Sequence, residues 1–186
     1  SLKLSRVAGC NFDIGVFTNF SEDHISPKEH PDMEDYLNSK LKLFNICKKA
    51  FVNVDNIYAS RILNSIKNCD VKTYGIDNAA DLLARDITIT NSYVDFMVKL
   101  ETRNERVKVG IPGRFSVYNA LAAISVCKKL GCSSENIKKA LEEVRVPGRS
   151  ELVDNSTLMK ARVWVSNRST GSSSNCSPRW CGGMAT

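Results

Sequence analysis

Lys40 lies where its surroundings could change the chemistry of its amine. Tyr36, Lys40 and Phe44 are four residues apart, so on a helix the three side chains share one face. Apolar surroundings favour the neutral form of an amine, and a neutral amine can react with carbon dioxide. The product is a carbamate, an anion whose oxygen atoms suit Mg²⁺. The alternative is a lysine whose ammonium reaches solvent from the edge of the helix.

His24 is the second residue whose position indicates a site. It follows the apolar run 13–18, which predicts a buried strand. Open α/β sheets bind ligands beyond the carboxyl ends of their strands, and the polar loop 19–31 would lie there. The alternative is a surface histidine without a role, as single histidines in polar loops usually are.

Strands and helices alternate through the first half of the chain. Asp32 is expected to cap a helix whose apolar residues recur at spacings of three and four until about Lys49. The elements expected next are a strand at 50–54, a helix at 57–66 and a strand at 71–76. This alternation predicts an α/β fold with a mostly parallel sheet flanked by helices.

The pattern then changes. Two extended runs, 93–100 and 106–111, surround a polar turn and predict an antiparallel hairpin on the edge of the sheet. Two helices are expected after the hairpin, one from Phe115 to a left-handed cap at Gly131 and one from Ser133 or Ser134 to Pro147.

The composition gives no case for a nucleic-acid or membrane partner. The net charge of the 186 residues is +6, but four of the 26 basic residues lie in 156–186, which contains no acid. The rest is nearly balanced, without a membrane-spanning apolar stretch or a signal-peptide pattern after Ser1. Seven cysteines, an odd number without a CxxC pair, favour free thiols. These features predict a cytoplasmic protein.

Four motifs together resemble the Mur ligase family. Gly15-Val-Phe-Thr-Asn-Phe-Ser-Glu-Asp-His24 resembles its strand end T-N-x-S-x-D-H, and Asp32-Met-Glu-Asp-Tyr-Leu-Asn-Ser-Lys40-Leu-Lys-Leu-Phe44 resembles its helix D-M-E-x-Y-x-x-x-K-x-x-L-F. Gly113-Arg-Phe-Ser-Val-Tyr-Asn119 resembles G-x-x-N-x-x-N, with Ser116 where the first asparagine is usual. Gly148-Arg-Ser-Glu151 resembles the interdomain motif G-R-x-E. The four motifs follow one another in the order expected of the family.

The resemblance assigns roles to single residues. It implies that Lys40 is carbamylated and that Lys40 and His24 hold magnesium. Asn119 resembles the asparagine that reads the adenine of ATP, and a local capping contact is the alternative. Arg149 resembles an arginine near the ATP phosphates, with an ordinary linker salt bridge as the alternative. Arg6 resembles an arginine that contacts a UDP-muramoyl substrate.

The resemblance also implies a domain organisation. Residues 1–147 would be the later part of a central ATP-binding domain with an incomplete, P-loop-like α/β fold. Residues 148–155 would be the hinge and the start of a C-terminal ligase domain, and 156–186 a disordered tail. No G-x-x-G-K-[ST] phosphate loop occurs in the chain, so we expect no ligase activity from it alone.

The implied activity is ATP-dependent amide formation through an acyl phosphate. The run His30-Pro-Asp-Met-Glu-Asp-Tyr36 resembles the branch that adds a third residue, lysine or diaminopimelate, to UDP-N-acetylmuramoyl-L-alanyl-D-glutamate in peptidoglycan synthesis. Asn53 and Asp55 resemble a strand end of the family to which we assign no role. The alternatives are another Mur-type ligase, a folylpolyglutamate synthetase, or a non-catalytic α/β binding module.

Overall fold

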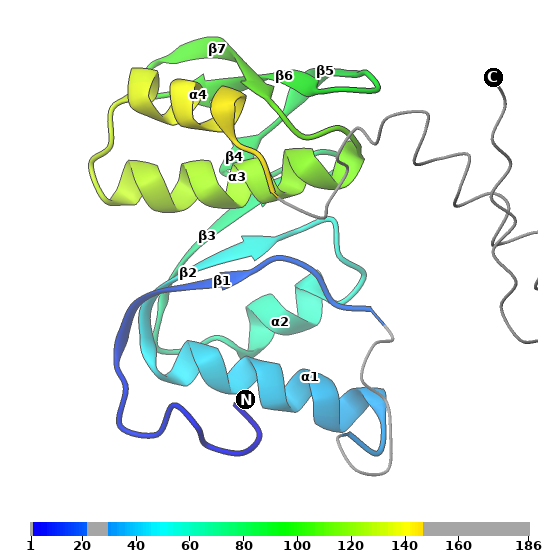
Figure 1. The fold of residues 1–186 in the computed structure, drawn as a ribbon. Helices are drawn as coiled ribbons and strands as arrows, with labels where there is room; N and C mark the ends of the chain where they lie inside the picture. Colours follow the sequence, from blue (N-terminus) through cyan, green and yellow to red (C-terminus); the bar gives the residue numbers. More distant parts are fainter. Residues whose placement is uncertain (1, 22–29, 147–186) are drawn as a thin grey trace, which may run out of the picture. The chain divides into compact units, whose positions relative to one another are not determined.

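The computed structural model describes residues 2–21 and 30–146, which lie within one compact unit, Ser1–Pro147 (Figure 1). The strands are β1 (Phe12–Phe17), β2 (Cys47–Asn53), β3 (Asp70–Gly75), β4 (Leu82–Leu83), β5 (Arg85–Ile89), β6 (Val94–Leu100) and β7 (Arg103–Val109). The helices are α1 (Met33–Leu41), α2 (Ala59–Ser65), α3 (Arg114–Lys129) and α4 (Ser134–Glu143), with a 3₁₀ helix at Lys42–Asn45. The predicted hinge and tail lie outside the described residues.

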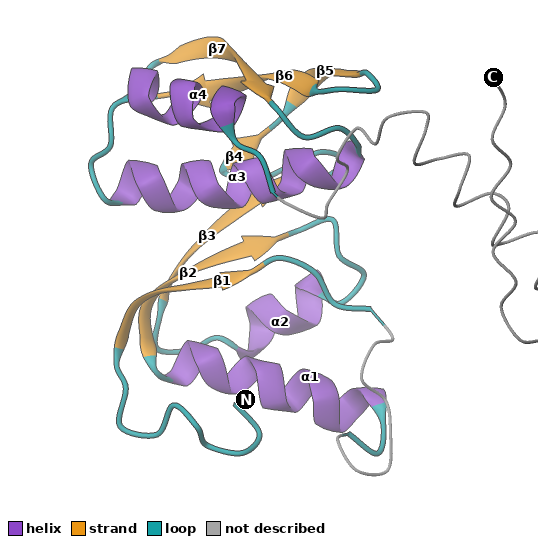
Figure 2. Cartoon of the chain, in the orientation of Figure 1, coloured by secondary structure: helices purple, strands orange, loops and turns teal. Residues whose placement is uncertain are grey.

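Four strands form a parallel sheet in the order β1-β2-β3-β4, which confirms the predicted α/β alternation. Helices α1 and α2 cover one face of this sheet and α3 covers the other (Figure 2). Strand β2 needs consecutive apolar residues because its side chains are buried on both faces of the sheet. Ala50 and Val52 pack with α1 and α2, whereas Phe51 packs in the core that contains α3.

Strands β5, β6 and β7 form a separate antiparallel sheet. The antiparallel pairing of the predicted hairpin is confirmed, but its expected place on the edge of the parallel sheet is wrong. After β4 the chain leaves the parallel sheet, and β5 pairs with β6 instead. The sequence gives little signal for β5, because most of its side chains are exposed. Alternate residues of β6 are buried, as expected for a sheet with one covered face: Val94, Phe96, Val98 and Leu100.

The helix that begins after Asp32 is shorter than predicted. It ends at Leu41, and β2 already begins at Cys47, so the prediction of a helix to about Lys49 is wrong. The backbone N–H of Phe12 donates to the carbonyl of Ile46 at 2.8 Å, and the parallel pairing of β1 with β2 continues from there. Pairing between strands has therefore overridden the helical spacing of the apolar residues.

The predicted helix caps are confirmed at three ends. The carboxylate of Asp32 accepts a hydrogen bond from the backbone of α1, and the hydroxyl of Ser133 does the same for α4. Gly131 has a φ of +82° after the end of α3, a conformation that residues with a Cβ rarely adopt. Helix α4 ends at Glu143, earlier than the predicted stop.

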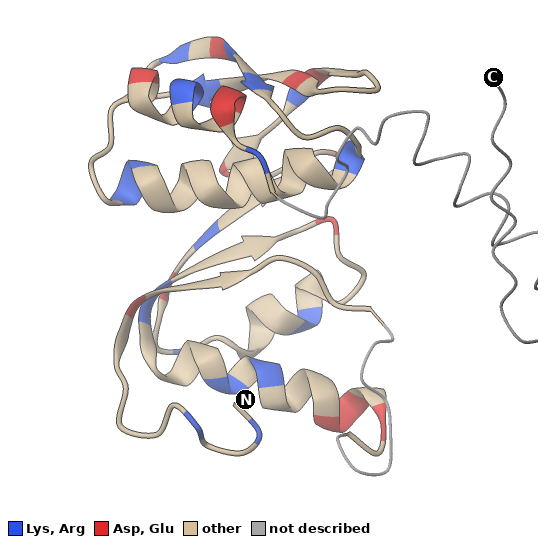
Figure 3. Ribbon diagram, viewed as in Figure 1, with Lys and Arg blue, Asp and Glu red and all other residues tan. Residues whose placement is uncertain are grey.

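Acidic and basic residues are interspersed along the elements (Figure 3). Helix α1 carries Glu34 and Asp35 in its first turn and Lys40 in its last turn, an arrangement that complements the helix dipole. None of the helices in the described ranges has the length and apolar character that crossing a bilayer requires.

Candidate functional site

A pocket of about 780 Å³ opens at the carboxyl ends of β1 and β2. Its walls come from the loops after these two strands, from the start of α1 and from the first turns of α3. The lining residues are Thr18, Asn19, Phe20, Ser21, Met33, Asn53, Asp55, Asn56, Ile57, Tyr58, Arg114, Phe115, Tyr118 and Asn119. This is the edge of the sheet at which open α/β proteins bind their ligands.

Two asparagine side chains hold the loops of the pocket together. The amide of Asn53, which is buried, donates to the carbonyl of Thr18 at 3.0 Å and accepts from the backbone N–H of Asp55 at 3.0 Å. The amide of Asn56 donates to the carbonyl of Phe20 at 3.1 Å. Residues 18–20, which follow β1, are therefore held by side chains from the end of β2 and from the loop after it.

Asp55 organises the loop that follows β3. Its carboxylate accepts hydrogen bonds from the backbone N–H groups of Ile76 at 2.5 Å, Asp77 at 3.0 Å and Asn78 at 2.8 Å. The side-chain amide of Asn78 adds a fourth bond at 2.9 Å. Burial alone would raise the pKa of Asp55, but these hydrogen bonds outweigh burial and hold its pKa below the ordinary value. Asp55 thus lies in the pocket wall as an anion that is stabilised by hydrogen bonds from the protein.

Arg114 and Tyr118 extend this network from the first turns of α3. The guanidinium of Arg114 donates to both carboxylate oxygens of Asp77, at 2.6 and 2.8 Å, and these bonds raise the pKa of Arg114. Burial, followed by the charge of Asp55, raises the pKa of Tyr118. Gly113, with a φ of +94°, allows the chain to turn into the helix.

Asn119 lies in the pocket wall and directly follows Tyr118 in the sequence. Its amide offers both a donor and an acceptor, and Phe115 and Tyr118 supply apolar surface. A flat heteroaromatic ring with a hydrogen-bonding edge suits these walls. Ser116, which stands where the family motif has its first asparagine, is buried and donates its hydroxyl to the carbonyl of Pro112 at 3.0 Å.

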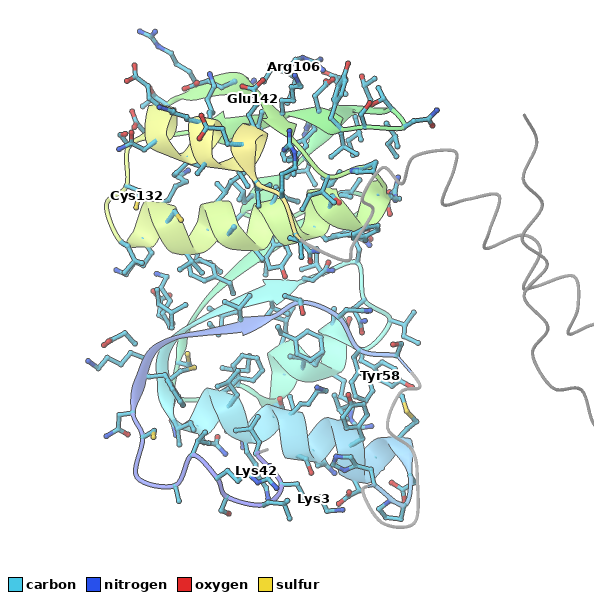
Figure 4. The ribbon with its side chains drawn as sticks, viewed as in Figure 1. Lys3, Lys42, Tyr58, Arg106, Cys132 and Glu142 are labelled. Atoms are coloured by element: carbon cyan, nitrogen blue, oxygen red, sulfur yellow. The ribbon has the colours of Figure 1, made fainter. Side chains whose placement is uncertain are left out.

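Lys40 is not among the residues that line the pocket, but aromatic rings connect it to the wall. Its Nζ lies 4.6 Å from the ring centroid of Tyr36, a cation–π contact. The Tyr36 ring is 4.9 Å from that of Phe20, which is 4.9 Å from that of Tyr58. Tyr58 lies just before α2, on the side of the start of α1 (Figure 4). The predicted carbamate of Lys40 stays a prediction.

The described part of the structure does not place the other predicted site residues in the pocket. Arg6 is exposed in the turns that precede β1 and does not line the pocket. His24 and Arg149 lie outside the described residues, so their roles stay predictions. Within 2–21 and 30–146, no group of three or more His, Cys, Asp or Glu side chains could hold a metal ion.

Only part of the network around Asp55 could be recognised in the sequence. The polar end of β2, Asn53-Val-Asp55, is visible in the sequence, but its hydrogen bonds to the loop after β3 are not. The pair of Arg114 and Asp77 joins residues 37 positions apart, and no local pattern links them. The sequence therefore indicates the edge of the sheet that carries the site, but not how the loops are held there.

The fold and the pocket define an open α/β domain, with a parallel sheet covered on both faces and a pocket at its carboxyl edge. A family model described as the Mur ligase middle domain matches residues 1–127. This chain belongs to the Mur ligase family, and the resemblance found in the motifs is confirmed.

Two curated relatives are named for the same reaction within that family. A UDP-N-acetylmuramoyl-L-alanyl-D-glutamate–2,6-diaminopimelate ligase of Caldanaerobacter subterraneus is 46% identical over 155 residues, 83% of this chain and 32% of the relative. Ligase 2 of the same name from Clostridium acetobutylicum is 40% identical over 156 residues, again 83% of this chain and 32% of the relative. The chain therefore spans about a third of the length of these relatives.

The solved structure of a ligase with that name is similar in fold. It superposes with a TM-score of 0.73 at 25% sequence identity, and the match covers 83% of this chain and 33% of the other. The match covers most of this chain, so the two proteins share the fold of this region.

Proposed function

We propose that the chain supplies the later part of the ATP site in a ligase that adds diaminopimelate to UDP-N-acetylmuramoyl-L-alanyl-D-glutamate. The observation that carries the proposal is the identity of 46% with a diaminopimelate ligase, in a chain whose pocket contains Asn119. Lysine, the other amino acid considered above, is less well supported, because both relatives described above are named for diaminopimelate.

In the proposed reaction, the terminal phosphoryl group of ATP is transferred to the substrate carboxylate, which forms an acyl phosphate and ADP. The amine of the incoming amino acid then attacks the carbonyl carbon, and phosphate leaves. Asn119 would hold adenine, Arg149 would lie at the phosphates and Arg6 would contact the UDP-muramoyl group. The Asp55 network would keep the loops of the pocket in place.

Lys40 and His24 would hold magnesium. As an ammonium, Lys40 would repel a cation, but its carbamate would offer two oxygen ligands, and the partly buried amine lies beside a series of rings that leads to the pocket. The oxygens of such a carbamate suit magnesium, which prefers oxygen ligands. When bound, the metal would offset the negative charge of the phosphoryl group in transfer.

A chimera tests the proposal directly. Residues 1–151 of this chain would replace the matching segment of the Caldanaerobacter ligase, and ATP-dependent addition of diaminopimelate would be measured by phosphate release. We expect an active chimera, and Lys40→Ala should lower its kcat by about 10²–10³-fold, as expected when a group that organises transition-state charge is lost. His24→Ala should give a loss of similar size.

Lys42→Ala is the matched control, because Lys42 is exposed two positions from Lys40 and should leave kcat unchanged. A folded chimera without activity would contradict the proposed function. Equal losses in Lys40→Ala and Lys42→Ala would contradict the role of Lys40. Acceptance of a folate or another muramoyl peptide in place of the proposed substrate would favour the alternative ligases.

A further inference from the structure

His30 is a buried polar residue to which the proposed function assigns no role. Its side chain is 11% exposed, and its Nδ1 lies 2.7 Å from a carboxylate oxygen of Asp35. An ionised carboxylate can only accept hydrogen bonds, so the Nδ1 atom carries the hydrogen and donates it. This bond fixes the orientation of the imidazole ring at the start of α1.

The ring of His30 lies against the residue that carries the Lys40 amine. The centroids of the His30 and Tyr36 rings are 4.7 Å apart, with an angle of 43° between their planes. Tyr36 also packs against Phe20, and the Lys40 Nζ lies over the Tyr36 ring. The place of the amine therefore depends on a tyrosine ring that His30 and Phe20 hold.

Asp35 is well suited to hold His30. It also accepts a hydrogen bond from the Nζ of Lys3 at 2.7 Å, and Lys3 lies against α1 (Figure 4). The Lys3 ammonium, followed by the His30 ring, holds the pKa of Asp35 below its ordinary value. Asp35 is also in the first turn of α1, where the helix dipole favours a negative charge. The carboxylate that orients His30 thus stays ionised around neutral pH.

We propose that His30, oriented by Asp35, is a positioning residue for Lys40: it fixes the Tyr36 ring and thereby the amine that the ligase requires. The importance of this placement for catalysis rests on the proposed function, whereas the placement itself can be tested without it. His30 and Asp35 do not line the pocket, so neither is a catalytic residue in this proposal.

The test measures how fast Lys40 of the 186-residue chain reacts with an amine-selective acetylating reagent, by peptide mass spectrometry. The exposed Lys42 is the internal reference in each sample. In His30→Asn the ring that holds Tyr36 is lost, and the Lys40 to Lys42 ratio should rise about two- to fivefold, the range expected when a cation–π contact is released. Asp35→Ala, which removes the acceptor of the His30 bond, should raise the ratio in the same direction but by less.

His30→Phe separates positioning from general stability. It keeps a ring against Tyr36 but loses the bond to Asp35, so its ratio should rise less than that of His30→Asn and about as much as that of Asp35→Ala. An unchanged ratio in His30→Asn, with the fold retained by circular dichroism, would overturn the proposal. If His30→Asn does not fold, a raised ratio in Asp35→Ala supports the proposal and an unchanged one overturns it.

The chimera adds a readout that depends on the proposed function. There, His30→Asn should lower kcat and leave the KM for ATP unchanged, and His30→Phe should restore most of kcat. A chimera that is inactive with the wild-type histidine would count against the proposed function alone, because the acetylation ratios would still report on the position of Lys40. A loss that appears only in the KM for ATP would overturn the role of His30.

Discussion

Tyr74→Ala is expected to lower the free energy of unfolding by about 3–5 kcal/mol, the cost of removing a large side chain from a close-packed core. Tyr74 is fully buried in β3, and its hydroxyl donates to the carbonyl of Phe17 at the end of β1, at 3.0 Å. This bond connects two strands that have β2 between them. Urea denaturation followed by circular dichroism measures the loss.

Two variants separate the contributions of the ring and the hydroxyl of Tyr74. Tyr74→Phe removes only the hydroxyl and should cost about 1–2 kcal/mol, because the Phe17 carbonyl loses a buried donor. Tyr93→Ala is the matched control, since Tyr93 is only partly buried, and it should cost much less than Tyr74→Ala. Similar losses for Tyr74→Ala and Tyr93→Ala would show that Tyr74 has no special place in the core.

Asp55→Ala is expected to cost about 2–4 kcal/mol, because three backbone N–H groups and one side-chain amide lose their acceptor in a partly buried site. The loop after β3 should then lose its fixed shape. Amide hydrogen exchange at Ile76, Asp77 and Asn78 measures the change. Protection there should fall in the variant, while protection in β6 and β7 should fall only as far as the loss of overall stability requires.

The Asp55 carboxylate should also make stability depend on pH. Its pKa is lower in the folded chain than the ordinary aspartate value, so its contribution is complete above about pH 4 and is lost as the pH falls through the folded pKa. Between neutral pH and acid, the unfolding free energy of the wild type should therefore fall further than that of Asp55→Asn. Identical pH profiles would contradict this role of Asp55.

Asp13→Ala is the control for the Asp55 variants. Asp13 is exposed and pairs with Lys48, and such surface pairs contribute little to stability. We expect Asp13→Ala to leave amide exchange in the loop after β3 unchanged. A loss of protection there would show that the effect of Asp55→Ala comes from removing a negative charge rather than from removing an acceptor.

Most of the α/β order could be predicted from the sequence. The apolar run 50–52 in β2 is continuous because both faces of its sheet are covered, and the caps Asp32 and Gly131 have conformational requirements that the residue types reveal. The end of α1 could not be predicted, because apolar residues recur at helical spacing beyond it. Pairing with β1, which begins at Cys47 beside Phe12, and with β3 makes that segment extended.

The location of the candidate site could be predicted from the sequence better than the contacts within it. Asn119 lies in the pocket because the end of β2 and the start of α3 meet at the carboxyl edge of the sheet. The bonds of Asp55 to residues 76–78 depend on how two loops close against each other, and so does the pair of Arg114 with Asp77. Contacts of this kind join residues far apart in the sequence and leave no periodic pattern.

Saturation-transfer NMR with ATP and Mg²⁺ tests the central claim, that the pocket at the carboxyl ends of β1 and β2 binds adenine. Irradiation of protein methyl groups in the purified chain should transfer magnetisation to the adenine protons, with a Kd on the order of 1 mM for a site that holds mainly the base. The signal should fall severalfold in Asn119→Ala and stay unchanged in Asn136→Ala, an exposed asparagine on α4. No transfer to adenine from the folded chain, or equal transfer in Asn119→Ala and the wild type, would contradict the account.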